Sequence, residues 1–378
     1  MTTKKNQTLT TKQLINYAVI IVIIVSSVIG YFTAEDKDNK GSKANNEAKF
    51  AKPENTDTTQ LIVMFYNLEN LFDTENDPKN RYDDDYTPEG SKEWTEQRFE
   101  TKVENLAKVI SNVSDDELPD LVGVCEIENR KVLEDLISQK PLEGQYKIIH
   151  EESKDVRGID LGLLYKPAEF KPIDHKKIDI YYKEGRPART REILFVKGLT
   201  LNNDTLYIFL NHWKSRLSRK DDNNAEYKRI AAAKSLRKAV DKVLKQNPEA
   251  KIIIMGDFND EPTNKSIYST LKAKDREHLK SKKYLFNTMY AADHDKQGTY
   301  FHDHHWIMFD NMIVSQAFLD SNSDIRLEGE GHVLKKDFML ETNRNGEQYP
   351  KRTYKHGEYQ PGYSDHLPIY IILKVFYN

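Results

Sequence analysis

Two short apolar runs in this chain are bordered by side chains of the kind that enzymes use in catalysis. Residues 252–255 lead directly into Gly-Asp-Phe-Asn at 256–259, and Ser-Asp-His-Leu-Pro at 364–368 leads into the apolar residues 369–372. A continuous apolar run of this length is typical of a buried strand. Because a strand end holds its side chains rigidly at the rim of a sheet, we expect an active site built from several strand ends.

The composition is typical of a globular protein rather than a disordered one, with 38% hydrophobic and 31% charged residues in a chain of 378. The formal net charge is −3, and residues 1–34 carry lysines but no acid, so the remainder is more acidic still. A protein that coats nucleic acid is usually basic, so a polyanion would have to meet a local basic patch or a bound cation. Cys125 is the only cysteine, which excludes an intramolecular disulfide and predicts a buried structural thiol among apolar neighbours.

Residues 14–33 form an apolar segment that is long enough to cross a membrane. At about 1.5 Å per residue, some 20 helical residues just span a hydrocarbon core of ~30 Å. The preceding residues 1–13 are basic and acids follow the segment, so we expect residues 1–13 to be cytoplasmic and the catalytic domain to lie outside the cytoplasm, in a single-pass membrane protein. A cleaved signal peptide, which would release a secreted protein, is the alternative.

Residues 34–59 are polar and predict a solvated tether, followed by one domain at residues 60–378. Helical periodicity predicts helices at 94–112 and 224–245, the second capped by Asp222 or Asn223. Strands are expected from residue 61 and at 120–126, 146–150, 160–165, 192–199, 205–210, 251–256, 307–314 and 368–376. The polar stretches 73–93 and 320–362 are too long for ordinary connections, which predicts functional rim loops or flexible segments. This order of elements favours a mixed α/β sandwich.

Acids, amides and histidines recur at the ends of six predicted strands. They are Asn67 and Glu69, Glu126, Asn211 and His212, Asp257 and Asn259, Asp310, and Asp365 and His366. A single polar residue at a strand end is more often a turn former than a catalyst. Six such strands, in a chain without the histidine and cysteine spacing of a zinc site, favour a catalytic centre.

Attack of water on a phosphate ester is the chemistry that requires such a set of side chains. Carboxylate and amide oxygens are ligands for Mg²⁺, with Mn²⁺ and Ca²⁺ as alternatives, and not for zinc. The cation offsets phosphate charge and stabilises the leaving oxygen. An aspartate orients or deprotonates the water, and a histidine held by a second aspartate offers a polarised N–H to the phosphoryl oxygens.

The ordered motifs resemble those of the endonuclease/exonuclease/phosphatase superfamily. They are Asn-Leu-Glu-Asn at 67–70, Cys-Glu-Ile-Glu-Asn at 125–129, Arg191, Asn-His-Trp-Lys-Ser at 211–215, Gly-Asp-Phe-Asn at 256–259, Phe-Asp-Asn-Met-Ile-Val at 309–314 and Ser-Asp-His-Leu-Pro at 364–368. The resemblance covers about residues 61–376. It implies the deoxyribonuclease-I-like fold, a four-layer α/β sandwich of two packed mixed β-sheets flanked by helices, here preceded by the expected transmembrane helix.

The resemblance also implies a metal site and its ligands. Glu126 would be the principal ligand, assisted by Asn67 and Asp365. Glu69 stands where some members of the superfamily place an acid of a second metal site. The metal implied is Mg²⁺, with Mn²⁺ or Ca²⁺ as alternatives.

The remaining implied roles concern the substrate and the attacking water. Asp257 would activate the water or serve the leaving group, and an Asp310–His366 pair would assist at the phosphoryl group. His212 and Arg191 would contact phosphoryl oxygens. Asn259, together with Arg191 and Asn67, would bind the substrate phosphate.

Two features separate this chain from characterised branches of the superfamily. The disulfides usual in secreted nucleases are impossible with one cysteine, and the catalytic tyrosine of the abasic-site enzymes has no counterpart that the sequence identifies. The chain looks more like uncharacterised bacterial members.

The leading functional hypothesis is a metal-dependent phosphodiesterase or endonuclease. A phosphatase, or a phosphoesterase acting on phospholipid or inositol phosphate, is the alternative within the same fold, and a non-catalytic binding protein is the remote one. The expected partners are a phosphoester substrate, nucleic acid among them, and a membrane reached through residues 14–33; nothing in the sequence indicates an obligate protein partner. The basic residues at 214–220 are open to two interpretations, a polyphosphate contact or a solvated loop.

Overall fold

The computed structural model describes residues 58–78, 80–183, 185–216 and 225–377. The expected cytoplasmic segment 1–13, the apolar segment 14–33 and nearly all of the tether at 34–59 lie outside these residues. Within the described part of the chain, no helix is both long and apolar enough to cross a membrane. Residues Asn55–Asn378 form one compact unit.

The first of two large sheets has six strands in the order β14-β19-β1-β2-β4-β3. β1 runs parallel to β2 and antiparallel to β19, so the sheet is mixed. Its strands are β1 (Thr58–Leu71), β2 (Leu121–Ile127), β3 (Lys147–Glu151), β4 (Asp160–Tyr165), β14 (Ile325–Val333) and β19 (Ile369–Phe376).

The second sheet has seven strands in the order β5-β6-β7-β8-β13-β10-β9. β7 and β8 are parallel neighbours, whereas β13 runs antiparallel to β8. Its strands are β5 (Phe170–Ile178), β6 (Ile193–Thr200), β7 (Thr205–His212), β8 (Lys251–Asp257), β9 (Ala273–Lys274), β10 (Leu285–Asn287) and β13 (Asp310–Ser315).

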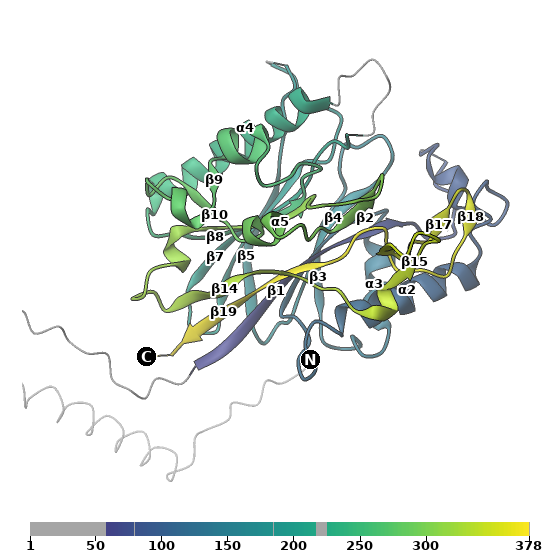
Figure 1. The fold of residues 1–378 in the computed structure, drawn as a ribbon, viewed down its shortest axis with the longest axis horizontal. Coiled ribbons are helices and arrows are strands. Elements are labelled where there is room, and N and C mark those ends of the chain that lie inside the picture. Colours follow the sequence, from purple (N-terminus) through teal and green to yellow (C-terminus); the bar gives the residue numbers. More distant parts are fainter. Residues whose placement is uncertain (1–57, 79, 184, 217–224, 378) are drawn as a thin grey trace, which may run out of the picture. The chain divides into compact units, whose positions relative to one another are not determined.

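The alternation of side chains along the strands divides the apolar residues into three cores and so defines the layers. Val63 and Phe65 of β1 pack in the core between the two sheets, while Ile62 and Met64, which point the other way, pack beneath α2 (Glu96–Ile110) and α3 (Arg130–Ser138). A third core lies between the second sheet and α4 (Glu226–Gln246). Figure 1 shows α4 on one side of the sheets and α2 with α3 on the other. The arrangement is a mixed α/β fold with two large mixed sheets covered by helices, as the sequence predicts.

Both predicted helices form within a few residues of their expected bounds. α2 begins after Thr95, whose side chain accepts a hydrogen bond from the backbone N–H of Arg98 and so caps the helix. Its apolar stripe, which includes Phe99, Val103 and Leu106, is buried as the periodicity predicts. α4 begins after Ala225, and the expected caps Asp222 and Asn223 lie outside the described residues.

The predicted single strand at 307–314 is wrong. The structure divides it into β12 (His305–Ile307), which pairs with β11 (Tyr300–His302), and β13, which pairs with β8 and β10. The division places Asp310 at the start of β13 and not inside a strand. The change of partner explains the break, because one straight strand cannot pair with a local hairpin and with the central sheet at once.

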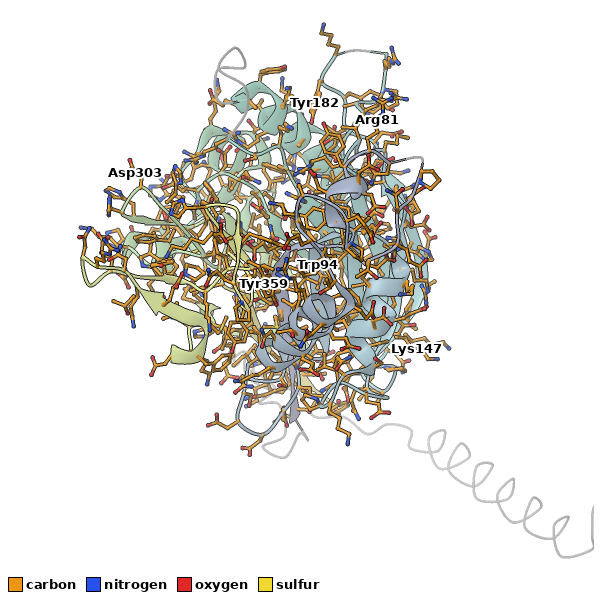
Figure 2. The ribbon with its side chains drawn as sticks, turned by 90° about the vertical axis from the view of Figure 1, so that its right-hand side faces the viewer. Arg81, Trp94, Lys147, Tyr182, Asp303 and Tyr359 are labelled. Atoms are coloured by element: carbon orange, nitrogen blue, oxygen red, sulfur yellow. The ribbon has the colours of Figure 1, made fainter. Side chains whose placement is uncertain are left out.

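The stretch 320–362 is more ordered than the sequence predicts. It contains the sheet strand β14 and the hairpins β15–β16 (Leu340–Thr342 and Gln348–Pro350) and β17–β18 (Tyr354–Lys355 and Glu358–Tyr359). The β17–β18 hairpin packs on the buried Trp94, with the ring of Tyr359 centred 6.5 Å from the indole, and the two lie side by side in Figure 2. These polar residues therefore build one rim of the molecule.

Candidate active site

The predicted site residues meet because six strand ends lie at the same edge of the two sheets. β1, β2, β7 and β8 end there, and β13 and β19 begin there because each runs antiparallel to a neighbour. The register places His212 and Asp310 on either side of Asp257 in the second sheet. Gly256 permits this spacing: a Cβ on it would lie 2.1 Å from the backbone oxygen of Asn211, so a larger residue would separate β7 from β8.

Asp257 is the hydrogen-bonded centre of the site. Its Oδ2 accepts from Nδ2 of Asn67 at 3.2 Å and from Nδ2 of Asn259 at 3.1 Å, and its Oδ1 accepts from the backbone N–H of Asn259 at 2.9 Å. The side chain is buried, and burial raises the pKa of Asp257 to about 7, with the positive charge of His366 opposing this and Asp310 adding to it. A carboxyl group with this pKa exchanges a proton readily near neutral pH.

His366 and Asp310 form a buried pair beside Asp257. Nδ1 of His366 lies 2.7 Å from Oδ2 of Asp310, and its Nε2 lies 4.0 Å from Oδ2 of Asp257. Burial by itself would lower the pKa of His366, but the Asp310 carboxylate outweighs it and raises that pKa well above the usual value. Ser364 positions the pair, since its hydroxyl accepts from the backbone N–H of His366 and donates to the backbone oxygen of Asn67.

Glu126 reaches the same place from the end of β2. Its Oε2 accepts a hydrogen bond from the backbone N–H of Asn70 at 3.0 Å, and its Oε1 lies 3.5 Å from Nε2 of His212. Glu126 has a φ of +60°, in the left-handed region, and Asn259 has a φ of +50°. Strained backbone of this kind is concentrated at functional sites, where it aims a side chain.

His212 is held as a neutral imidazole between two carboxylates. Its Nε2 lies 3.7 Å from Oδ2 of Asp257 and faces Glu126 on the other side. Burial lowers the pKa of His212 well below the usual value, and the positive charges of Arg191 and Arg157 lower it further. The two histidines of the site therefore differ in charge.

Arg191 lies behind the site and not in its cavity. Its guanidinium donates to the backbone oxygens of His212 and Trp213 and to Oδ2 of Asp155 at 2.6 Å, and the side chain is 1% exposed. These contacts use all three nitrogens. The resemblance implies a direct contact of Arg191 with phosphate. Its placement instead favours a role in holding the end of β7.

The two remaining acids differ in their access to the cavity. Glu69 is bound by Lys102 at 3.3 Å and by the backbone N–H of Thr353 at 2.7 Å, so its carboxylate links β1 to α2 and to the rim. Asp365 lines the cavity, with Oδ2 bound by Arg352 at 2.7 Å. Asp365 therefore faces the cavity beside Arg352, whereas the Glu69 carboxylate is bound by Lys102 and the rim and acts as a support.

A cavity of about 350 Å³ opens over these residues. Among the predicted residues Glu126, His212, Asp257, Asn259, Asp365 and His366 line it. Arg157 and Tyr300 also line it and were not predicted, whereas Arg216 belongs to the basic residues 214–220, for which a polyphosphate contact was one of two interpretations. Arg157 lies in the loop between β3 and β4. The first residue of β4, Asp160, pairs with Ile127, directly after Glu126. This pairing brings the loop to the site and was the signal that could have revealed Arg157.

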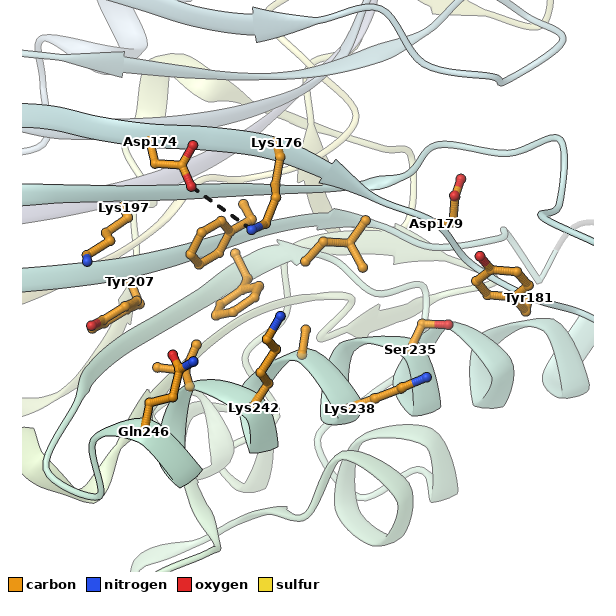
Figure 3. Close-up of a pocket in the computed structure, with 15 residues that line it drawn as sticks. Asp174, Lys176, Asp179, Tyr181, Lys197, Tyr207, Ser235, Lys238, Lys242 and Gln246 are labelled. Atoms are coloured by element: carbon orange, nitrogen blue, oxygen red, sulfur yellow. Dashed lines mark ion pairs between the residues drawn. The ribbon is translucent and has the colours of Figure 1, made fainter.

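A larger cavity of about 550 Å³, drawn in Figure 3, lies between α4 and the face of β5, β6 and β7. None of the predicted site residues lines it. Lys176 at its edge is 4.0 Å from Asp174. The cavity over Glu126 and Asp257 is therefore the one with the arrangement of a catalytic centre.

The donor atoms present suit a hard divalent cation. Glu126, His212 and Asp257 each offer a ligand atom within 4.8 Å of the others, and Asp257, Asp310 and His366 do the same. The hydrogen bond from Asn70 occupies only one oxygen of Glu126. Carboxylate oxygens dominate and the described residues offer no thiolate there, which fits Mg²⁺, Mn²⁺ or Ca²⁺ better than zinc.

The family is shown by sequence. The family model described as "Endonuclease/Exonuclease/phosphatase family" matches residues 62–375, and the chain belongs to this family. The resemblance inferred from the motifs is thereby confirmed. No curated protein matches the chain significantly.

Several solved structures share the fold at low identity. An endonuclease/exonuclease/phosphatase family protein from Bacteroides thetaiotaomicron is 16% identical, with a TM-score of 0.50 over 84% of this chain and 99% of that one. A mannosyl-6-phosphatase from Bacteroides thetaiotaomicron VPI-5482 is 16% identical, with a TM-score of 0.50 over 83% and 99%. D. rerio TDP2 complexed with single strand DNA product is 14% identical, with a TM-score of 0.50 over 83% and 99%. At these identities the likeness establishes the fold alone.

Proposed function

We propose that this protein is a metal-dependent phosphoester hydrolase acting on phosphodiesters. The observation that carries the proposal is the placement of His366, held from behind by Asp310, in one cavity with Asp257 and Glu126. Water attack on a phosphate needs a base, a fixed donor to the phosphoryl oxygens and a cation site, and this cavity offers a group for each.

The protein's own groups have distinct tasks in this proposal. Asp257, with its pKa near neutrality, takes the proton of the attacking water. His366, kept protonated by Asp310, donates Nε2–H to a phosphoryl oxygen. Asn259 fixes the Asp257 carboxylate through two hydrogen bonds, so the base is oriented before substrate arrives.

The cation site in this proposal consists of Glu126 with Asn67 and Asp365. When bound, a divalent cation supplies a Lewis acid that offsets charge on the phosphate and on the leaving oxygen. Asn70 holds the Glu126 carboxylate from one side, and neutral His212 faces it from the other without adding a repelling charge.

A phosphomonoesterase is the second candidate. The mannosyl-6-phosphatase of the same fold and the small volume of the cavity, about 350 Å³, favour it. The diester is preferred because the stacked aromatic rings of Tyr300 and Phe309 border the cavity and offer a surface to a second group esterified to the phosphate. TDP2 with its single strand DNA product shows that this fold accommodates such a chain.

Hydrolysis of two chromogenic esters tests the proposal. We expect bis(p-nitrophenyl) phosphate, a diester, to be cleaved faster than p-nitrophenyl phosphate, a monoester, in the presence of Mg²⁺, Mn²⁺ or Ca²⁺, and neither to be cleaved in EDTA. His366→Ala serves as the inactive control. Preference for the monoester would support the phosphatase, and full activity in EDTA would refute the metal requirement.

We also propose that the apolar segment 14–33 holds the enzyme on the outer side of the cytoplasmic membrane. The full-length protein should then appear in the membrane pellet, and protease added outside that membrane should release the catalytic domain. A shortened soluble form beginning near residue 35 would establish the cleaved signal instead.

A further inference from the structure

A further cavity of about 680 Å³, distinct from the one in Figure 3 and called the second cavity below, lies next to the candidate active site. It is lined by two segments that are far apart in sequence, residues 80–82 and 153–158, together with Arg189. The second segment also supplies Arg157 to the active-site cavity, so one loop forms the wall between the two cavities.

The wall between the cavities is held rigidly by Asp155. Its Oδ1 accepts from the backbone N–H of Arg157 at 3.0 Å and from Nε of the same residue at 3.3 Å. Its Oδ2 accepts from Arg191, whose Nε donates to the backbone oxygen of His212. The second cavity is thus tied through two residues to the end of β7 in the active site.

The outer rim of the second cavity is docked on this wall. Nδ2 of Asn80 donates to the backbone oxygen of Arg157 at 3.0 Å, and Oδ1 of Asn80 accepts from the backbone N–H of Tyr82 at 3.1 Å. Gly158 makes the approach feasible, because a Cβ there would lie 2.2 Å from Nδ2 of Asn80 and φ is +65°. The segment 80–82 therefore has a fixed position beside the active site.

The second cavity combines positive charge with exposed ring surface. Arg81 and Arg189 are exposed and form no ion pair within the described residues, whereas Lys154 is paired with Asp179 and Glu192. Tyr82 is 52% exposed and Val156 is 54% exposed. In Figure 2 Arg81 lies on the opposite side of the view from Asp303.

We propose that this second cavity, lined by Arg81, Tyr82 and Arg189, is a subsite for a single-stranded nucleic acid that extends beyond the hydrolysed phosphodiester; the inference rests on the proposed function. Free arginines neutralise backbone phosphates, and an exposed tyrosine stacks on an unpaired base. The rigid wall places this subsite beside the reacting phosphate. Chain length beyond that phosphate then determines how well a substrate is used.

Two substrates of different length test the subsite in the full-length protein. One is a fluorescein-labelled single-stranded DNA of about 12 nucleotides, and the other is bis(p-nitrophenyl) phosphate, which is too short to reach the second cavity. Tyr82→Ala and the double variant Arg81→Ala/Arg189→Ala should each lower the ratio of the two kcat/KM values by about tenfold, the scale of one lost stacking or phosphate contact. Arg344→Ala, which removes an exposed arginine elsewhere, should leave the ratio unchanged.

Binding without turnover separates the subsite from the proposed chemistry. In EDTA, fluorescence anisotropy should show about tenfold weaker binding of the same oligonucleotide to both variants than to the wild-type protein. The loss of binding with salt should be steeper for the wild type than for the double arginine variant, and unchanged for Tyr82→Ala. Unchanged binding and an unchanged ratio would overturn the subsite. Loss of hydrolysis of both substrates by the wild type, with the binding differences intact, would refute the proposed function and leave the subsite standing.

Gly158→Ala provides a variant that removes no charge or ring. It should displace Asn80 and the segment that it docks, and so lower oligonucleotide binding to the same extent as the double arginine variant. Gly144→Ala is the matched control, since Gly144 also has a positive φ but no atom within 4 Å of its Cβ position. Equal binding by the two glycine variants would show that the position of residues 80–82 does not matter.

Discussion

Oδ2 of Asp310 lies 2.7 Å from Nδ1 of His366, and both side chains are almost fully buried. The hydrogen bond fixes which ring nitrogen faces the aspartate and therefore directs the other one, Nε2, toward Asp257. His366 depends on Asp310 both for its orientation and for its charge. The two residues are expected to act as one unit.

Kinetics of variants test this unit. His366→Ala removes the donor to the phosphoryl group and Asp310→Asn leaves the imidazole without its fixed orientation, so each should lower kcat by on the order of 10²-fold or more. The double variant should be little worse than His366→Ala, because groups that act together are non-additive. Losses that multiply fully would show that the two residues act independently.

The two histidines of the site should have pKa values on opposite sides of the usual histidine value. The pKa of His366 is raised and that of His212 is lowered, so at pH 6.5, the ordinary histidine pKa, His366 is charged and His212 is neutral. NMR titration of the metal-free protein in EDTA measures both. Asp310→Asn should bring the pKa of His366 down, and an unchanged value would separate the charge of His366 from Asp310.

If Glu126 binds the cation and Asp257 is the base, as proposed, removal of the first should be distinguishable from removal of the second. Glu126→Gln should lower kcat and also raise the Mg²⁺ concentration needed for half activation, by at least about tenfold. Asp257→Asn should lower kcat with a smaller change in that concentration. Glu143→Gln, at an exposed position, is the control for the loss of one negative charge. Activation curves that coincide for the wild type and Glu126→Gln would place the metal elsewhere.

Substitution of the two arginines near the site should affect stability and activity differently. Arg191→Ala leaves the buried Asp155 carboxylate without its main partner and should cost about 3–5 kcal/mol of the free energy of unfolding. Arg157→Ala removes a partly exposed group from the cavity wall, so it should change stability by less than about 1 kcal/mol while raising KM. Urea denaturation and steady-state kinetics of both variants measure the contrast, which equal stability losses would contradict.

Glu128 should make stability depend on pH in the opposite sense to an ordinary carboxylate. Burial raises the pKa of Glu128 to about 9 and also raises that of Asp83, so the folded protein holds a proton on Glu128 that the unfolded chain releases near pH 4.5. The free energy of unfolding should therefore fall as pH rises from about 4.5 toward 9. Glu128→Gln should remove much of this fall, because glutamine keeps an acceptor for the backbone N–H of Asp73. Denaturation at pH 5 and pH 8 checks it.

The layers of the fold were predictable where strands are buried on both faces. β1, β2 and β8 appear in the sequence as uninterrupted apolar runs, and each forms a central strand. β5 and β14 were not predicted, because both lie at a sheet edge and leave most of their side chains only partly buried or exposed, so their sequences are rich in polar residues.

The site was predictable to the extent that its residues lie within local motifs. Glu126, Asp257 and His366 stand directly at the ends of apolar runs, and the structure brings them to one cavity. That Arg157 and not Arg191 lines the cavity was not predictable. Asp155 pairs with both arginines, but only Arg191 is buried. Such a choice is made by contacts across the chain, which no local pattern records.

The hydroxyl of Ser364 donates to the backbone oxygen of Asn67, a residue 297 positions earlier in the chain, and β19 pairs with residues 58–65 of β1. The first and last strands of the domain thus complete the centre together. A growing polypeptide lacks His366 and one of the two neighbours of β1 until residues 366–376 have left the ribosome. On the proposed function, a chain truncated before residue 364 lacks both Ser364 and His366, and it should have no catalytic activity.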